Sequence, residues 1–338
     1  MKNRNSNDLA TLVTRFLTDY LPLQRGYSEN TIKSYRDTIK LFLRYVNEKE
    51  GIQLKNFRLE DVSKEIIIRF LDDYRSNGAS ISAANQRLAA LKTFADYAQL
   101  DSLECMASLH RITGIKATKY KSREIHYLTS EETEKLINFP SLSTFTEFRH
   151  RVVMTLLYDS GCRVQELCDL NIGDIYLGAD TTVRLHGKGE KYRTVIVSDG
   201  TGRLLQNYLN RFRIGALKTD PLIINRNRTR INRDGVGYIL AKYASALHAE
   251  DPSYPEHVHC HMLRHSKAMH MLEAGINIVY IRDFLGHEDI STTMIYAKAD
   301  NRKKKEVIDA LAPKLTGTND LPDWTEDRNL LAFLESLK

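Results

Sequence analysis

The chain has 338 residues, enough for two ordinary domains of about 100–200 residues each. Hydrophobic residues make up 42% and charged residues 27%, which excludes a disordered or collagen-like chain. The formal charge of +6 is a mild basic excess that permits a nucleic-acid partner without requiring one.

No stretch approaches the roughly 18 consecutive apolar residues that a membrane helix needs, and the N-terminus lacks the apolar core of a secretory signal. The four cysteines are scattered without paired spacing, so we expect reduced thiols rather than a disulfide framework. These features predict a cytoplasmic protein.

The first third of the chain predicts four helices. Apolar residues repeat at helical spacing in 9–21 and 32–46, on either side of the turn-like segment QRGYSEN. Two further helical stretches follow at 62–76 and 83–99, the first ending in the helix breaker Asn77-Gly78. We assign residues 1–118 to a helical domain.

A basic segment follows, and residues 111–123 contain five bases and no acid. We assign 119–126 to a linker, because the next domain opens with a capping box made by Thr129 and Glu132. That second domain is assigned to 127–312, and a C-terminal tail to 313–338.

The second domain mixes helices with a β-hairpin. A helix is expected at about 147–159, then a turn and short helix in GCRVQELCDL (161–170). Residues 181–197 alternate around the Gly-rich centre GKGEK, which predicts a hairpin. The remainder is mostly helical, and Gly275 and Gly286 lie where helix C-caps are expected.

The segment HVHCHMLRH (257–265) holds four histidines and a cysteine, which raises the possibility of a metal site. In an extended stretch, His257, His259 and His261 share one face, so three ligands are geometrically possible. A structural zinc site usually has two ligand pairs separated by a loop. The sequence has no second pair of Cys or His residues that would complete such a site with these. We therefore predict no metal.

The longer segment 261–296 has a different pattern. His261 and Arg264 are three residues apart, so both lie on the first turn of a helix. His287 follows in LGH, just beyond a glycine-ended helix, and Tyr296 comes nine residues later near the end of a short helix.

This ordered series resembles the C-terminal signature of the tyrosine recombinases, the phage-integrase and Xer-like DNA recombinases. GCRVQEL resembles the family's first arginine motif and gives Arg163 and Glu166, and GKGEK resembles the hairpin that carries its catalytic lysine, Lys188. Residues 28–46 and 83–98 resemble its N-terminal core-binding domain. The resemblance covers roughly residues 8–312.

The resemblance implies a mainly α-helical fold with a small β-sheet. A helical, SAM-like core-binding domain precedes a mixed α/β catalytic domain. It further implies a bacterial, nucleoid-associated enzyme that uses no cofactor, acts on double-stranded DNA with specific sites, and works as a homotetramer on two of them. Accessory proteins are not indicated.

The chemistry explains these residue types. Tyr296 would attack a phosphate and form a 3′-phosphotyrosine, which conserves the energy of the broken bond. Arg163 and Arg264 suit the non-bridging oxygens, because a guanidinium stays charged and presents a planar fork. His261 and His287 would add hydrogen bonds to the phosphate or accept the tyrosine proton.

Lys188 would protonate the departing 5′-oxygen, and Glu166 would orient neighbouring donors such as Arg163. Lys191 and Arg193 compete with Lys188 for the acid's role, although we favour contacts with the phosphate backbone for both. The residues expected to contact DNA are Lys116, Lys119, Lys121, Arg123, Lys191 and Arg193.

Each of these residues alone also has a purely structural interpretation. We assign His265 and His270 to packing around the site, and His257 and His259 to the surface or the DNA-facing side. Cys260 stands where the family often has proline, which leaves the geometry of the preceding turn open.

Two other functions fit parts of the pattern. One is a type IB topoisomerase, which uses a similar tyrosine, and the other is a non-catalytic DNA-binding regulator. In the tail, Leu330, Leu331, Leu334 and Leu337 form an apolar stripe that packs either on its own domain or on a neighbouring protomer. We favour a transposase or integrase of a mobile element over a housekeeping role, because of this additional tail.

Overall fold

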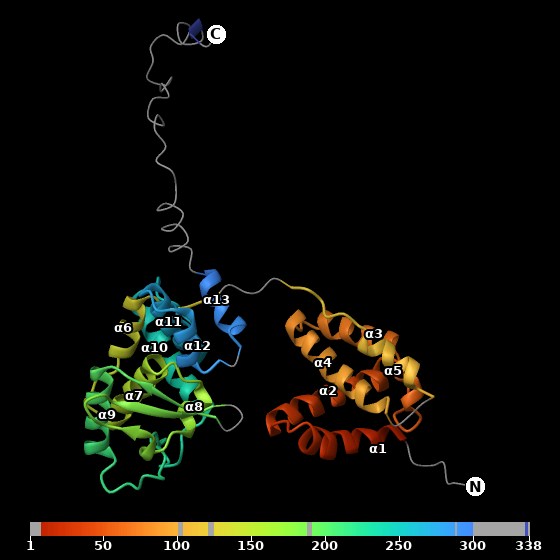
Figure 1. The fold of residues 1–338 in the computed structure, drawn as a ribbon, viewed down its shortest axis with the longest axis horizontal. Coiled ribbons are helices and arrows are strands. Elements are labelled where there is room, and N and C mark those ends of the chain that lie inside the picture. The colour runs from red at the N-terminus through yellow and green to blue at the C-terminus, as the bar shows by residue number, and fades with distance from the viewer. Residues whose placement is uncertain are drawn as a thin grey trace. The chain divides into compact units, whose positions relative to one another are not determined.

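A computed structural model of the chain describes residues 8–100, 104–120, 125–187, 191–287, 289–299 and 335–336. The chain divides into two compact units, residues 1–123 and 124–338 (Figure 1). The division falls inside the segment 119–126 that the sequence analysis assigns to a linker. Each unit is described by itself.

The described part of the first unit is entirely helical. It starts with α1 (Asp8–Arg15), which continues into a π-helical stretch (Phe16–Gln24) containing Pro22. The other elements are α2 (Glu29–Glu48), a 3₁₀ turn (Leu59–Asp61), α3 (Lys64–Ser76), α4 (Ile81–Ala98) and α5 (Met106–Thr113). Serine N-caps accept hydrogen bonds from Ile66 N in α3 and Ala83 N in α4, which satisfies amides that the helices leave unpaired.

Helix α5 corrects the expectation of four helices. Its Leu109 and Ile112 are 0% exposed and belong to the core of the first unit, so residues up to Thr113 are part of the domain. The following segment is held to α4, because Asn85 exchanges hydrogen bonds with both backbone groups of Thr118 at 2.9 and 3.0 Å. The helix was missed because its eight residues are too few for a clear periodic pattern.

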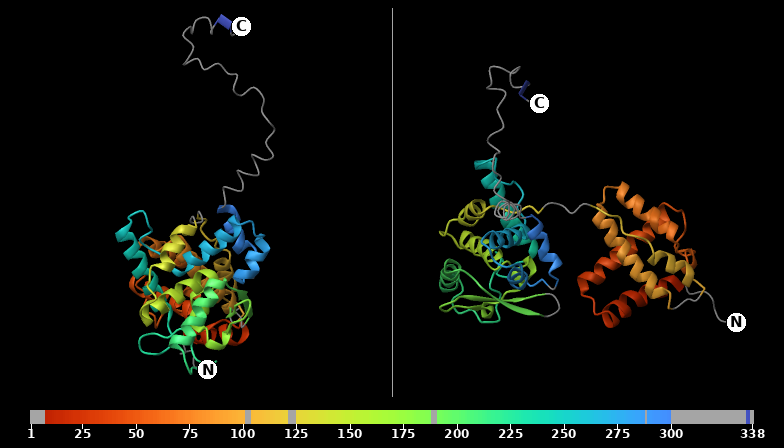
Figure 2. Two further views of the ribbon diagram at one scale, coloured as in Figure 1. Left: turned by 90° about the vertical axis from the view of Figure 1, so that its left-hand side faces the viewer. Right: turned by 45° about the horizontal axis from the view of Figure 1, so that its top comes forward.

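The second unit combines helices with a three-stranded antiparallel sheet in the order β1–β2–β3. Figures 1 and 2 show the strands toward one end of this unit, with α6, α11, α12 and α13 toward the other. The strands are β1 (Ile175–Tyr176), β2 (Thr182–His186) and β3 (Tyr192–Ile196), preceded by a 3₁₀ turn (Ile172–Asp174). The helices are α6 (Ser130–Asn138), α7 (Phe145–Asp159), α8 (Val164–Asp169), α9 (Asp199–Phe212), α10 (Arg233–Glu250), α11 (Cys260–Glu273), α12 (Ile278–Leu285) and α13 (Ser291–Ala299).

Several sequence predictions for this unit are confirmed. The chain is mainly helical with a small sheet, and strands β2 and β3 flank the Gly-rich centre of the predicted hairpin. Thr129 and Glu132 form the capping box at the start of α6, with the Thr129 amide donating to the Glu132 carboxylate at 2.7 Å. Gly275 and Gly286 have φ angles of 89° and 65° at the ends of α11 and α12, a conformation that glycine adopts without a steric penalty.

Two hydrophobic clusters hold the second unit together. The larger one includes Val183, Leu185 and Val195 from the inner face of the sheet. The smaller one joins α11, α12 and α13 and contains Ala268, Met269, Leu272, Ile281, Leu285 and Tyr296. Burying each large apolar side chain contributes roughly 1.5–3 kcal/mol, so this smaller cluster fixes α13 against α11 and α12.

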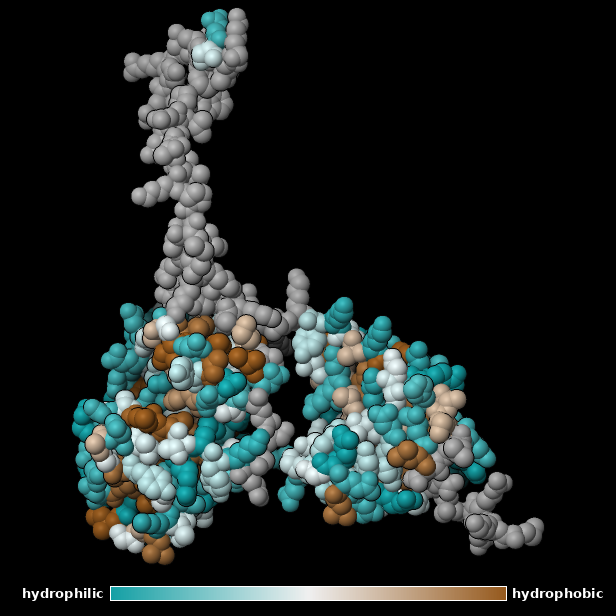
Figure 3. Space-filling view, viewed as in Figure 1, coloured by the Kyte–Doolittle hydropathy of each residue, from teal (hydrophilic) through white to brown (hydrophobic). Residues whose placement is uncertain are grey.

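Apolar side chains also reach the surface of these helices. In Figure 3 they gather in the upper part of the second unit, where Figure 1 places α11, α12 and α13. Val279, Met294 and Ile295 are 40%, 39% and 36% exposed.

Among the described residues, no helix is long and apolar enough to cross a membrane.

Candidate active site

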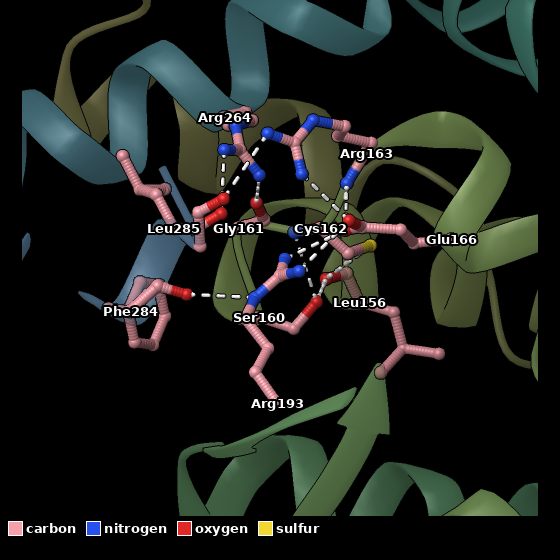
Figure 4. Close-up of polar contacts among 11 residues, drawn as sticks. Leu156, Ser160, Gly161, Cys162, Arg163, Glu166, Arg193, Arg264, Phe284 and Leu285 are labelled. Atoms are coloured by element: carbon pink, nitrogen blue, oxygen red, sulfur yellow. Dashed lines mark hydrogen bonds and ion pairs between the residues drawn. The ribbon is translucent and has the colours of Figure 1, made fainter. Parts of the chain in front are cut away.

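Three arginines from separate elements converge on the carboxyl end of α12 (Figure 4). A helix leaves its last carbonyl groups unpaired and carries a partial negative charge there, so this end attracts cations. Three consecutive carbonyls each accept from one guanidinium: Phe284 from Arg193 Nε at 3.1 Å, Leu285 from Arg264 Nη2 at 2.8 Å and Gly286 from Arg163 Nη2 at 3.4 Å.

Glu166 joins two of these arginines. Its carboxylate accepts from Arg163 Nη1 at 2.9 Å and from Arg193 Nη1 and Nη2 at 2.9 and 2.7 Å, and it also caps α8 by accepting from the Arg163 amide at 2.8 Å. Burial raises the pKa of Glu166, but the hydrogen bonds and charges of Arg193 and Arg163 outweigh it and hold the pKa below its usual value. The expected contact between Glu166 and Arg163 is confirmed.

Arg193, which the sequence analysis expects to contact DNA, lies inside this cluster. Arg193 is two residues before Val195 on β3, and the alternation of a strand turns both side chains toward the inner face of the sheet. The Arg193 side chain is 14% exposed, and both of its terminal nitrogens donate hydrogen bonds to the Glu166 carboxylate. These contacts orient Glu166 within the protein.

Arg264 is the most deeply buried of the three, at 3% exposed. Besides Leu285, its guanidinium donates to the Gly161 carbonyl at 2.6 Å, which ties α11 to the turn before α8. Burial, with the charges of Arg163 and Arg193, lowers the pKa of Arg264 to about 10, so the group remains charged at neutral pH.

The cluster has an excess of positive charge. Three guanidiniums and one carboxylate leave two net positive charges within one hydrogen-bonded group. Each guanidinium has five N–H donors, and the carbonyl and carboxylate contacts use only some of them. The arrangement suits a ligand with negative charge spread over several oxygens.

The start of α11 positions His261 beside this cluster. His259 is the N-cap, and its Nδ1 accepts from the Met262 amide at 3.1 Å. The geometry left open by Cys260 is therefore set by a capping histidine. His261 is exposed, and desolvation by the surrounding protein together with the charges of Arg264 and His259 lowers its pKa.

His287 follows the α12 C-cap. Its Nδ1 lies 2.8 Å from Oγ1 of Thr293, a fully buried residue of α13. Burial and the charges of Arg264, Arg163 and others lower the pKa of His287 to about 4, so its ring is neutral near pH 7.

Tyr296 extends from α13 toward α11 and is 1% exposed. Its Oη lies 2.9 Å from His265 Nδ1, and the two rings have centroids 5.6 Å apart. Burial raises the pKa of the Tyr296 phenol, and the charges of Arg264 and Arg163 oppose that shift. The prediction assigned His265 only to packing, although its spacing of four residues from His261 placed both on one face of the helix.

Lys188 lies outside the described residues, as do Lys121 and Arg123. The neighbouring Gly187 can be placed: a Cβ on it would be 3.6 Å from Glu166 Oε1 and 3.7 Å from Arg193 Nη1. The hairpin therefore enters this cluster just before position 188. Lys116, Lys119 and Lys191 are exposed.

Two other histidines of this part of the chain lie apart from the cluster, His270 on α11 and His257 before it. His270 lies between Tyr158 Oη at 2.9 Å and the Leu128 carbonyl at 3.0 Å, in line with its predicted packing role. The His257 side chain is 88% exposed. Across the part of the chain that the structure describes, no three His, Cys, Asp or Glu side chains are grouped to hold a metal ion.

Comparisons with known proteins find matches over both units of the chain. Residues 126–303 match the phage integrase family, and residues 13–100 match the phage integrase N-terminal SAM-like domain. A protein of Sinorhizobium fredii described as an integrase/recombinase is 31% identical over 331 residues, covering 97% of this chain and 98% of that relative. The tyrosine recombinase XerD of Staphylococcus haemolyticus is 27% identical, covering 90% of this chain and 100% of that protein.

Solved structures share the fold. The XerH site-specific recombinase in a post-cleavage complex with its difH substrate has a TM-score of 0.66 at 21% identity, over 84% of this chain and 80% of that one. The Tn1549 transposon integrase with transposon right end DNA has a TM-score of 0.65 at 15% identity, over 89% of this chain and 99% of that one.

Proposed function

The chain belongs to the phage integrase family of tyrosine recombinases, and we propose that it is a site-specific recombinase that cleaves and rejoins duplex DNA through a 3′-phosphotyrosyl intermediate. The observation that carries this proposal is a buried tyrosine beside α11, whose Arg264 belongs to a cluster with two net positive charges. A phosphodiester is the anionic group on which such a nucleophile acts.

The cluster would bind the scissile phosphate. Arg163 and Arg264 supply fixed charge for the non-bridging oxygens, and their contacts with α12 hold them in place before DNA arrives. Preorganised donors of this kind stabilise charge that develops in the transition state, and losing one typically costs about 10²- to 10³-fold in rate. His261 and His287 complete the set as hydrogen-bond donors through their ring N–H groups.

In the chemical step, Tyr296 Oη attacks phosphorus and the bond from phosphorus to O5′ breaks. The phosphotyrosine stores the energy of the broken bond, so rejoining uses neither ATP nor a metal ion. Lys188 protonates the leaving O5′, with Lys191 as the competing candidate. The placement of Gly187 beside Glu166 supports a lysine of this hairpin in that role.

A conformational change must precede the attack of Tyr296 on the phosphate. Tyr296 is 1% exposed, so a phosphate reaches its Oη only after part of the cover provided by α11, α12 or α13 shifts. DNA binding is the event that would drive this shift.

Recombination would involve four protomers, two DNA sites and two rounds of strand exchange through a Holliday junction. We assign the chain to a mobile element because of its additional C-terminal tail; the Sinorhizobium fredii relative is described as an integrase/recombinase. The catalytic domain, 127–312, would be joined by the linker 119–126 to the core-binding domain. The tail, 313–338, would dock on a neighbouring protomer.

Recombination of a plasmid tests this proposal. The binding site is first identified by selection from random duplexes and from DNA flanking the gene. Two copies of it are then placed on one supercoiled plasmid. A recombinase yields deletion or inversion products. Relaxation alone would indicate topoisomerase activity, and binding without strand breakage would indicate a regulator. A truncation after Pro313 that still forms tetramers and recombines normally would contradict the proposed role of the tail.

A further inference from the structure

His265 contacts the Tyr296 hydroxyl, and the steps proposed above give this histidine no role. His265 Nδ1 lies 2.9 Å from Tyr296 Oη, and within the described residues it is the one side chain hydrogen-bonded to that oxygen. His287 uses its Nδ1 on Thr293 instead. His261 contacts the His265 ring, with centroids 6.2 Å apart.

The geometry suits proton transfer. A general base must lie within about 2.6–3.2 Å of the atom whose proton it takes, and His265 meets this condition before DNA is bound. His265 directly follows Arg264 on α11, so one turn of helix carries both a phosphate-binding guanidinium and a partner of the nucleophile.

The protonation state also fits. Burial, with the charges of His261, His259 and Arg264, lowers the pKa of His265 to about 4, so the ring is neutral, and in the tautomer with its proton on Nε2 the Nδ1 atom can accept a proton. A bound phosphate would bring negative charge to Arg264 and His261, which offsets their effect and strengthens His265 as a base during the reaction.

We propose that His265 Nδ1 is the general base that accepts the proton of Tyr296 Oη. As the bond from Oη to phosphorus forms, the Oη proton moves to Nδ1 and an imidazolium results. The bond from phosphorus to O5′ breaks, and O5′ takes a proton from the general acid. Religation reverses each transfer, so His265 returns the proton to the tyrosine. This inference rests on the proposed function.

The test is single-turnover formation of the covalent adduct at saturating DNA, using His265→Asn. The asparagine side chain retains a hydrogen-bond acceptor near the place of Nδ1 but is not a base. We expect the rate to fall about 10²- to 10⁴-fold, the usual contribution of general-base catalysis. The control, Glu256→Gln, changes a 59% exposed side chain just before α11 and should react at the wild-type rate.

A fluorinated tyrosine at position 296 separates base catalysis from a structural role. Site-specific incorporation is needed because the chain has 17 tyrosines. The fluorinated phenol ionises more readily and is a weaker nucleophile, so it should slow the wild type slightly but accelerate His265→Asn.

A wild-type rate in His265→Asn would overturn the proposal, and so would a defect that the fluorinated tyrosine fails to relieve. Absence of an adduct from the wild-type protein would instead contradict the proposed function itself.

Discussion

At Glu166, a single buried carboxylate determines where two guanidiniums lie. Both oxygens are occupied by Arg163 and Arg193, and the side chain is 4% exposed. Removing one partner of a buried ion pair leaves an uncompensated charge and typically costs about 3–5 kcal/mol. Glu166 therefore contributes to both the stability and the electrostatic layout of the site.

We predict that Glu166→Gln lowers the free energy of unfolding by about 3 kcal/mol at pH 7. The pKa of Glu166 is lowered in the folded protein, so its contribution is complete above its unfolded value and is lost as pH falls through the folded value. The difference between wild type and variant should therefore shrink below about pH 4.

Urea unfolding between pH 7 and pH 3 measures this difference. Glu256→Gln, which changes a 59% exposed side chain, is the matched control and should unfold like the wild type at every pH. A constant gap between wild type and Glu166→Gln would show that the carboxylate charge is not responsible.

Residue-level prediction worked where two residues are close in the chain. The contact between Arg163 and Glu166 follows from their spacing of three residues on a helical turn. His265 and Tyr296 are 31 residues apart, so their contact depends on how α13 packs against α11. Spacing alone cannot supply that information.

Among the elements, α12 has the largest effect on the site. Its last carbonyls anchor all three arginines, and Gly286 ends it with a φ of 65°. A Cβ at Gly286 would lie 2.9 Å from Cδ of Arg193, closer than real contacts allow. The glycine is thus required for both its backbone conformation and the approach of Arg193.

We predict that Gly286→Ala costs about 1–2 kcal/mol of stability from the left-handed backbone, with a further loss from displacing Arg193. DNA cleavage should fall at least as clearly, because Arg193 and Glu166 orient the cluster. Thermal unfolding and single-turnover cleavage measure the two effects.

Gly237 offers the matched control for that variant. It lies within α10 without positive φ, and a Cβ there would meet nothing within 4 Å. Gly237→Ala should be neutral or slightly stabilising, by up to about 1 kcal/mol. Equal behaviour of the two variants would contradict the structural role given to Gly286.

The sequence predicted strongly patterned elements and missed a weak one. The hairpin, the capping box of α6 and the glycine helix ends have local signals that structure preserves. Helix α5 has eight residues and gains its order from burying Leu109 and Ile112 in the core, a tertiary effect that local pattern does not reveal.

At the scale of the whole molecule, DNA affinity should come mainly from phosphate contacts. The chain carries a formal charge of +6, and Lys116 and Lys119 are exposed after α5. Binding to phosphates releases counterions, so affinity falls with salt according to the number of phosphates neutralised.

We predict that the double variant Lys116→Ala, Lys119→Ala weakens binding on all sequences. It should reduce the slope of log affinity against log salt by about 2, roughly one for each lysine. Fluorescence anisotropy across a salt series measures the slope. Lys218→Ala, an exposed lysine in the loop after α9, is the control, and an unchanged slope in the double variant would remove this segment from the DNA interface.

The most direct test of the account uses a DNA duplex carrying the selected site, nicked so that cleavage releases a short fragment and traps the covalent complex. Wild type and Tyr296→Phe are compared in EDTA, which removes metal ions. The account predicts a protein–DNA adduct from the wild type, with phosphate linked to Tyr296, and none from the variant. No adduct from the wild type, or an undiminished one from Tyr296→Phe, would contradict it.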